Sequence, residues 1–469
     1  MRALLVGVFV AFLGGCPAVK DTVFPHCNLF SETATCIDAE AARDIAIFFD
    51  GTANTEESRT NVFKLHSLIT LQDRPHVHTY YLQGVGTDRK LTGNALGRGI
   101  GDRAKLAYLY LANTYRPGDN IYLFGFSRGA YNARILAGMI YVAEFPDLGS
   151  LDDNEQRSLV DEIYEAYTST GELSEKRDAV ARIASYSPVT SSTRIRFMGI
   201  FDTVSALSYE PDEENQLAEL SEKYVDQICN IDRVAHAMSI DDNRGRTFSP
   251  VSLKVTAIGM QCDEIVGIRD SEEQQSAISS LIGERISEVW FSGAHSDIGG
   301  GYTEDALSGV PINWMLRRML EVRSLSRIIP PEPFQYEDIY GTSHIGEDAL
   351  INGGLYINKN RILPYYGAQL DTAHQRLSIH SSVLLRRSKV PRTCREFDFN
   401  LYGDPEDRSH DWCYREPMER GIGNYSECFK RVPLKSEHLV SDRRLADFTL
   451  QYTCDEGNSL FDIDEPELY

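Results

Sequence analysis

The sequence has few basic residues for its number of acidic ones. Among its 469 residues, Lys and Arg total 47 against 69 Asp and Glu, and the formal net charge at pH 7 is −22. Binding to the phosphates of nucleic acid needs a basic surface, so this imbalance argues against a nucleic-acid partner. Hydrophobic residues make up 42% and charged residues 25%, which is the composition of a globular protein with a large core.

Long hydrophobic runs are also missing beyond the start of the chain. The apolar run over 3–13 is shorter than the roughly 20 residues that cross a bilayer, but after a positively charged start it suits a signal peptide. It leads to two glycines and Cys16, which resembles the bacterial lipoprotein signal. We predict a lipoprotein-type signal peptide over 1–16 with lipid attached to Cys16. An ordinary signal peptide, cut near Ala18, is the alternative.

Motifs for common metal and cofactor sites are absent too. The sequence has no CxxC pair and no HExxH motif, which are patterns of zinc sites. Gly97, Gly99 and Gly101 lack the spacing of a dinucleotide-binding loop. We therefore expect no cofactor and no metal. There are nine cysteines, and setting Cys16 aside leaves an even number, which permits disulfides in an exported chain but fixes no pairing.

Short apolar runs alternate with helical patterns along the first two thirds of the chain. This alternation predicts an α/β fold of the α/β-hydrolase type, with a mostly parallel sheet, helices on both faces and helical insertions. The expected strands are 44–49, 77–82, 120–124, 193–201, 253–259 and 287–291, and the expected helices 102–115, 128–143 and 312–322. Two charged segments, near 147–185 and 205–243, are expected to be the insertions.

Composition also suggests how the chain is divided. Residues 17–42 are polar and irregular, which predicts a tether between the lipid anchor and the folded body. Residues 43–325 carry the strand and helix pattern and form the predicted catalytic domain. Prolines, aromatic residues and four cysteines collect in 326–469. We expect this part to be a C-terminal extension that packs in part on the catalytic domain.

The motif Gly125-Phe126-Ser127-Arg128-Gly129 lies between a predicted strand and a predicted helix. In this G-x-S-x-G context the serine occupies a strained turn, the nucleophile elbow, that only small residues can flank two positions away. Its hydroxyl then projects above the sheet as a nucleophile. The backbone N–H of Arg128, at the start of the helix, can stabilise the oxyanion that forms.

A nucleophilic serine needs a base, and the base needs a carboxylate that orients it. In this fold the order along the chain is serine, acid, histidine, each after the end of a strand. Asp202 directly follows the predicted strand 193–201, and His295 follows the strand 287–291 in a glycine-rich segment. We therefore predict a triad of Ser127, Asp202 and His295.

Other residues compete for these roles. Asp297 can replace Asp202 as the orienting acid or can hold its own loop. The rival bases are His236, which we expect on a helix of the acidic insertion, and His380.

The first strand is followed by Asp50-Gly51-Thr52. Gly51 or Thr52 could supply a second oxyanion N–H. The carboxylates at 50, 202 and 297 could instead surround a metal ion together with His295.

Several of these stretches resemble one family. They are Phe48-Phe49-Asp50-Gly51-Thr52, Gly84-Val85-Gly86-Thr87, 115–130, Gly199-Ile200-Phe201-Asp202-Thr203-Val204, 236–241, 289–302 and 379–383. Together they resemble an α/β-hydrolase domain family of formerly unknown function, which is similar to the catalytic domain of class-one type VI secretion phospholipase effectors. The resemblance covers about 44–385.

The resemblance implies a triad at Ser127, Asp202 and His295, and hydrolysis of carboxyl esters with phospholipid as the favoured substrate. One departure is the export signal, since such effectors are loaded from the cytoplasm. Another is Phe201, where the family often has Trp.

We therefore expect an anchored serine esterase or lipase acting on lipid or other esters. Its place would be the bacterial cell envelope, facing the periplasm or the surface, or it would be secreted. The alternatives are a metal-assisted phosphoesterase and a non-catalytic envelope binding lipoprotein. The sequence leaves any protein partner undetermined.

Overall fold

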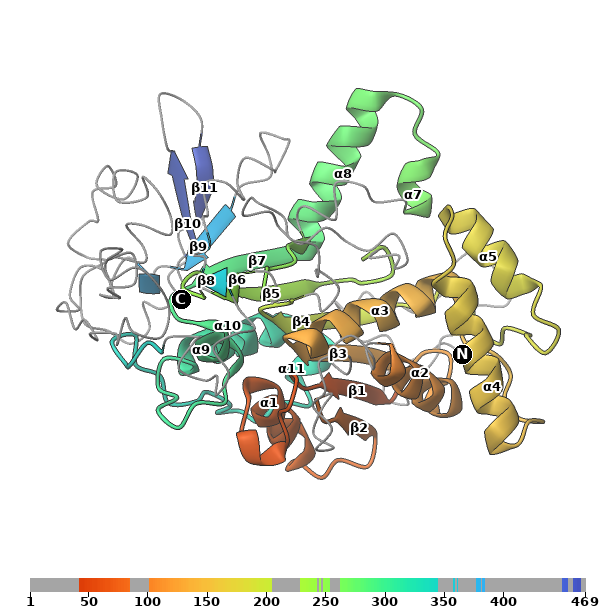
Figure 1. Cartoon of the computed structure of the whole chain (residues 1–469), viewed down its shortest axis with the longest axis horizontal. Coiled ribbons are helices and arrows are strands. Elements are labelled where there is room, and N and C mark those ends of the chain that lie inside the picture. The colour runs from red at the N-terminus through yellow and green to blue at the C-terminus, as the bar shows by residue number, and fades with distance from the viewer. Residues whose placement is uncertain are drawn as a thin grey trace, which may run out of the picture. The chain divides into compact units, whose positions relative to one another are not determined.

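The fold is known from a computed structural model (Figure 1). The residues that it describes are 42–84, 101–204, 228–242, 244–245, 248–253, 262–344, 357–358, 361, 377–380, 382–383, 449–453 and 459–464. Residues 43–469 belong to one compact unit. Within the described ranges, no helix is both long enough and apolar enough to span a bilayer. Cys16 and the predicted signal peptide and tether lie outside them, apart from Ala42.

Nine of the described strands form one sheet with the order β10-β11-β9-β7-β5-β4-β3-β1-β2 (Figure 1). Two short strands, β6 (Arg244–Gly245) and β8 (Ile357–Asn358), pair separately. The nine strands are β1 (Asp44–Phe49), β2 (Val77–Leu82), β3 (Asn120–Phe126), β4 (Ile195–Phe201), β5 (Val234–Ser239), β7 (Ile286–Phe291), β9 (Leu377–His380), β10 (Thr449–Thr453) and β11 (Ser459–Asp464). From β2 to β9 and on to β11 every pairing is parallel, and β10 alone runs antiparallel to its neighbours. The predicted mostly parallel sheet is confirmed.

Two hydrophobic cores cover the two faces of the sheet. In β1, Ile45, Ile47 and Phe49 join one core and Ala46 and Phe48 join the other. A strand covered on both faces has apolar residues at successive positions, which is why β1 has an uninterrupted apolar run. The first core takes its helices from α2 (Asp102–Thr114), α3 (Arg128–Ala143), α4 (Asp153–Tyr167), α5 (Leu173–Ala181) and α8 (Ser271–Arg285), and the second from α1 (Asn61–Thr70), α10 (Gly309–Leu320) and α11 (Arg323–Ser326).

The prediction for 205–243 is wrong for its last part. His236 lies on β5, a central strand between β4 and β7, and not on a helix of an insertion. All of β5 is buried, and Ala235 and Ala237 pack in the core on one face. Its polar residues, His236 and Ser239, interrupt the apolar run that would have predicted a buried strand. They can be buried because other strands and loops supply hydrogen-bond partners. The expected strand 253–259 lies outside the described residues apart from Leu253.

A disulfide joins Cys229 to Cys262. Cys229 lies shortly before β5, and Cys262 lies directly before α7 (Asp263–Val266). Both cysteines are buried. The bridge therefore links the segment just before β5 to the segment just before α7, and β5 lies within the loop that it closes.

The loop that follows β1 is organised by Asp50. Its buried carboxylate accepts hydrogen bonds from the N–H of Gly51 (2.7 Å), the hydroxyl of Thr60 (2.7 Å) and the hydroxyl of Tyr81 (2.5 Å). Thr60 caps α1 and Tyr81 belongs to β2, so one side chain ties three elements together. Burial outweighs these hydrogen bonds and raises the pKa of Asp50 to about 6.

We expect loss of the disulfide to destabilise the fold. The cysteines are 33 residues apart, and releasing a loop of this length lowers the free energy of unfolding by about 3–4 kcal/mol. Urea unfolding of the double variant Cys229→Ser/Cys262→Ser, compared with the oxidised protein, measures the difference. Equal midpoints would contradict a structural role for the bridge.

Asp50 should also make stability depend on pH. Its pKa is about 6 when folded and 3.8 as a free side chain. Between these values the folded state binds a proton that the unfolded state lacks, so stability falls as pH rises from about 4 to about 6. The shift corresponds to about 3 kcal/mol. Urea unfolding of Asp50→Asn across this range should show a smaller decline, whereas the exposed Asp153→Asn should match the wild type. Parallel curves for Asp50→Asn would contradict this assignment.

Candidate active site

Ser127 occupies the turn between β3 and α3. Its backbone is in the left-handed region, with φ 59° and ψ −127°, a strained conformation that non-glycine residues adopt mainly at functional sites. The flanking glycines are required by close packing. A Cβ on Gly129 would lie 2.2 Å from the carbonyl oxygen of Phe49, and one on Gly125 would lie 2.6 Å from the Cα of Ala130. The strand, turn and helix that the G-x-S-x-G motif needs are all present.

Asp202 follows β4 at the same edge of the sheet. The N–H of Ser127 donates to the carbonyl of Phe201 (3.0 Å), so the two turns are adjacent. Asp202 is fully buried and also has a positive φ, 37°. Its carboxylate accepts hydrogen bonds from Nδ1 of His295 (2.5 Å) and from the N–H of Ser239 (2.9 Å). The structure thus brings together the predicted acid and the predicted base, although they are 93 residues apart.

His295 begins α9 (His295–Gly299), just after β7. Its backbone N–H donates to Asp242 (3.0 Å), and its ring is packed against the rings of Phe126 (4.6 Å between centroids) and Phe248 (4.9 Å). Phe126 directly precedes Ser127. The ring orientation is therefore fixed on several sides. Its Nε2 is buried and has no hydrogen-bond partner among the described residues.

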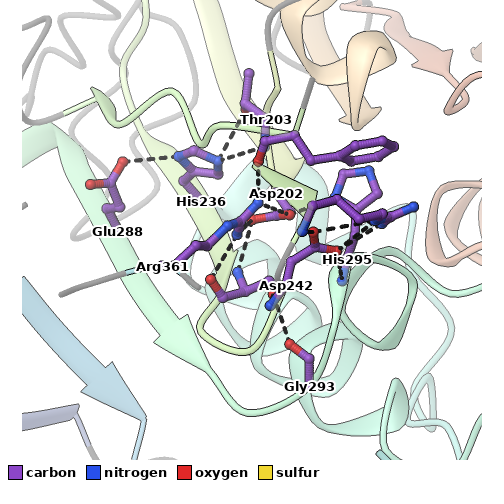
Figure 2. Close-up of polar contacts among 11 residues, drawn as sticks. Asp202, Thr203, His236, Asp242, Glu288, Gly293, His295 and Arg361 are labelled. Atoms are coloured by element: carbon purple, nitrogen blue, oxygen red, sulfur yellow. Dashed lines mark hydrogen bonds and ion pairs between the residues drawn. The ribbon is translucent and has the colours of Figure 1, made fainter. Parts of the chain in front are cut away.

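The Asp202 carboxylate has a further partner that the sequence did not reveal. Arg361 donates from Nη1 to Oδ1 (2.7 Å) and from Nη2 to Oδ2 (3.0 Å), and Figure 2 shows both contacts beside His295. Burial raises the pKa of Asp202, but Arg361 and His295 outweigh it and lower the pKa to about 2. Arg361 belongs to no recognisable motif, so only the tertiary structure places it here.

A second ion pair lies on the other side of the imidazole. Asp242, which accepts from the N–H of His295, is paired with Arg244 (2.7 Å), and the guanidinium of Arg244 lies over the ring of Phe248 (3.6 Å). Burial raises the pKa of Asp242, but the guanidiniums of Arg244 and, to a smaller extent, Arg361 outweigh burial and hold this pKa well below its usual range. Burial lowers the pKa of His295, and Arg244 lowers it further, whereas Asp202 raises it. The net effect lowers the pKa of His295 below its ordinary value.

His236, a rival base, has both ring nitrogens occupied. Its Nδ1 contacts Glu288 (2.9 Å), and its Nε2 accepts from the N–H of Thr203 (3.2 Å) and contacts the Thr203 hydroxyl (3.0 Å), as Figure 2 shows. Glu288 and His236 are fully buried between adjacent strands. This pair holds the residue that follows Asp202, so it supports the turn at the end of β4.

The other two rival residues also have separate partners. The carboxylate of Asp297 accepts from Nδ1 of His344 (2.7 Å) and from the N–H of Ala294 (2.9 Å), so it holds its own loop and does not contact Nδ1 of His295. His380 is on β9, is hydrogen-bonded to Ser382 (2.8 Å) and is stacked on Phe291. Burial lowers its pKa well below the ordinary value.

The candidate oxyanion donors differ in their present partners. The N–H of Gly51 donates to the Asp50 carboxylate. Thr52 is therefore the remaining candidate in this loop for the second oxyanion N–H. Arg128 is the first residue of α3, where the helix dipole favours negative charge. As to a metal, no three His, Cys, Asp or Glu side chains in the described part of the chain are placed to hold an ion together.

Comparisons with known proteins place the chain. The curated "Uncharacterized protein YEL023C" of Saccharomyces cerevisiae is 25% identical over 60% of this chain and 58% of its own length. Among solved structures, the Tle1 effector bound to the VgrG spike of the type VI secretion system is 18% identical, covers 61% of this chain and 56% of its own, and has a TM-score of 0.29. The apo form of Thermogutta terrifontis esterase 2 is 13% identical, with 64% and 89% covered and a TM-score of 0.32.

The family description "T6SS, Phospholipase effector Tle1-like, catalytic domain" matches residues 43–318, which is more than half of the chain. The match begins at β1 and ends within α10, and so includes the turns that carry Ser127, Asp202 and His295. The chain belongs to the family of Tle1-like phospholipase effector catalytic domains.

Proposed function

We propose that the protein is a serine hydrolase that cleaves carboxyl esters of lipids, with phospholipid as the substrate class, through Ser127, His295 and Asp202. The observation that carries the proposal is the contact of 2.5 Å between Asp202 and Nδ1 of His295. This contact leaves the opposite nitrogen, Nε2, as the one that can take a proton. Membership of the phospholipase effector family supports the same reaction class.

In the proposed mechanism, Ser127 Oγ attacks the acyl carbon while Nε2 of His295 takes the hydroxyl proton. Asp202 orients the imidazole and stabilises its positive charge. The tetrahedral intermediate then collapses, the ester C–O bond breaks, and His295 returns the proton to the leaving alcohol. Water attacks the acyl-enzyme with the same histidine as base, which releases the fatty acid and restores the serine.

The oxyanion would be held where the helix dipole of α3 is positive. The N–H of Arg128 lies at this helix start, and Thr52 is the proposed second donor because Gly51 already donates to Asp50. Donors fixed by the fold stabilise the developing charge without reorganising. The network of Asp50 with Thr60 and Tyr81 would keep this loop in place.

We further propose an extracytoplasmic location at the bacterial cell envelope, with the lipid on Cys16 as the membrane anchor. Disulfides persist in oxidising compartments, and the pair Cys229–Cys262 supports export. An anchor at Cys16 would keep the enzyme close to lipid substrate. Secretion without an anchor remains the alternative outcome, which mass analysis of the mature N-terminus distinguishes.

Activity should persist at mildly acidic pH. The base must be neutral to accept the serine proton, and burial lowers the pKa of His295 below its ordinary value of 6.5. A lower pKa keeps the imidazole neutral to lower pH, so the acid limb of the kcat/KM profile should lie below 6.5. Initial rates on a soluble short-chain ester across pH 4–9 measure it. A limb at or above the ordinary value would contradict the burial of this histidine.

Replacement of the nucleophile should remove the activity. Ser127→Ala should lower kcat at least about 10⁴-fold on a short-chain ester and on phospholipid vesicles. The matched control is Ser169→Ala, which should retain the wild-type rate. Ser169 follows α4, and its hydroxyl donates only to the carbonyl of Ala166 among the described contacts. A serine-directed phosphonate should label the peptide that contains Ser127 and no other.

Three results would contradict this function. Equal ester turnover by Ser127→Ala and the wild type would exclude the serine mechanism. Release of phosphate that a chelator abolishes and the phosphonate spares would select a metal-assisted phosphoesterase instead. If neither activity is found and Ser127→Ala supports normal growth of a cell that needs the protein, a binding role would be favoured.

A further inference from the structure

We propose that Arg361 is a positioning residue for the catalytic acid, supplied by a part of the chain that lies beyond the matched catalytic domain. The proposal rests on the triad proposed above. Family matching ends at residue 318, and Arg361 is 159 residues from Asp202 along the chain. A segment outside the family's catalytic domain thus completes the support of the acid.

The geometry of Arg361 is that of a clamp. Its guanidinium forms two parallel hydrogen bonds to the two oxygens of Asp202 (2.7 and 3.0 Å) and also donates to the carbonyls of Ser239 (2.7 Å) and Phe248 (2.8 Å). Arg361 is 4% exposed. The fork of an arginine matches a carboxylate in this way and fixes its plane, which a lysine cannot do. Figure 2 shows the contacts of Arg361 with Asp202.

Asp202 needs this support because its own conformation is unfavourable. The residue has φ 37° and a fully buried carboxylate. A buried carboxylate is retained only if its charge is compensated and its oxygens are hydrogen-bonded. Without Arg361, the carboxylate would keep the N–H of Ser239 and the imidazole of His295 as partners among the described residues. One backbone N–H and the neutral imidazole would then have to hold the carboxylate that orients this imidazole.

The charges around the imidazole point to a second consequence. The ionised groups that contact it or its partners are two carboxylates, Asp202 and Asp242, and two guanidiniums, Arg361 and Arg244. These charges cancel when His295 is neutral. Protonation of His295 would add a buried positive charge. Arg244 lowers the pKa of His295, and the guanidinium of Arg361, which is paired with Asp202, adds a second like charge near the imidazole.

Other ionisable groups pack nearby on the surrounding elements. They are Asp241, which accepts from the N–H of Gly293, Asp297 with His344 on and beside α9, Tyr302 beyond α9, and Glu288 with His236 behind Thr203. The Nδ1 of His295 is hydrogen-bonded to Asp202, and Arg361 contacts Asp202 directly. Arg361 is therefore the group whose removal should alter both the position of the acid and the titration of the base.

Two substitutions separate these effects. Arg361→Met removes the charge and the fork, so kcat should fall about 10-fold through misplacement of the acid, and the acid limb of kcat/KM should move up by about one pH unit. Arg361→Lys keeps the charge and loses the fork, so kcat should fall while the acid limb stays at the wild-type pH. A merely structural role would not divide in this way.

A double-variant cycle tests whether Arg361 acts through Asp202. In Asp202→Asn, which has no carboxylate to clamp, adding Arg361→Met should cause no further loss of kcat. The matched control is Arg194→Met. Arg194 directly precedes β4, at the end of the strand away from Asp202, and pairs with Asp232 (2.6 Å). Its replacement should leave the pH profile unchanged.

The outcomes are distinguishable from those of the proposed function. If Arg361→Met and Arg361→Lys match the wild type in kcat and in acid limb while Ser127→Ala is inactive, the clamp is overturned and the triad stands. An additive loss in the Asp202→Asn background also overturns it. If Ser127→Ala is fully active, the proposed function itself fails. Should Arg361→Met not fold, as circular dichroism would show, the Arg361→Lys profile and its cycle with Asp202→Asn decide the matter.

Discussion

The hydrogen bond between Asp202 and His295 is the interaction on which the rest of the site depends. It joins the turn after β4 to the first residue of α9, and it fixes which nitrogen of the imidazole carries a proton. The nearest contacts of the site act on these two residues. Phe126 and Phe248 hold the ring, Ser239 and Arg361 hold the carboxylate, and Asp242 holds the backbone of the histidine.

This arrangement follows from the parallel sheet. In parallel strands the carboxyl ends meet at one edge, so the turns after β3, β4, β5 and β7 come together although their residues are far apart along the chain. The backbone bond from Ser127 to Phe201 shows how closely two of these turns approach. Buried charge is tolerated there because it is paired. Two carboxylates and two guanidiniums lie around an imidazole whose pKa burial lowers.

A second buried pair shows that support extends behind the site. Glu288 and His236 connect adjacent strands β7 and β5 and reach Thr203, the neighbour of the acid. The same residue types that could serve a triad here serve the backbone, because both ring nitrogens are occupied. Chemistry is thus assigned by accessibility and partners and not by residue type alone, which is why His236 could not be separated from His295 by its identity.

The sequence by itself determined the class of fold, the elbow at Ser127 and the order in which the acid and the histidine would follow. Apolar runs and glycines can be read locally, because each reflects packing around one short segment. Gly129, for example, must lack a side chain because a Cβ there would collide with the carbonyl oxygen of Phe49. The strand that carries His236 was missed, since polar residues buried on both faces are stabilised by partners from other strands. Only the tertiary structure decided that Asp202 and not Asp297 contacts the Nδ1 of His295, that Asp297 holds His344, and that Arg361 clamps the acid. These pairings join residues distant along the chain, and a hydrogen bond between them leaves no periodic trace in the sequence.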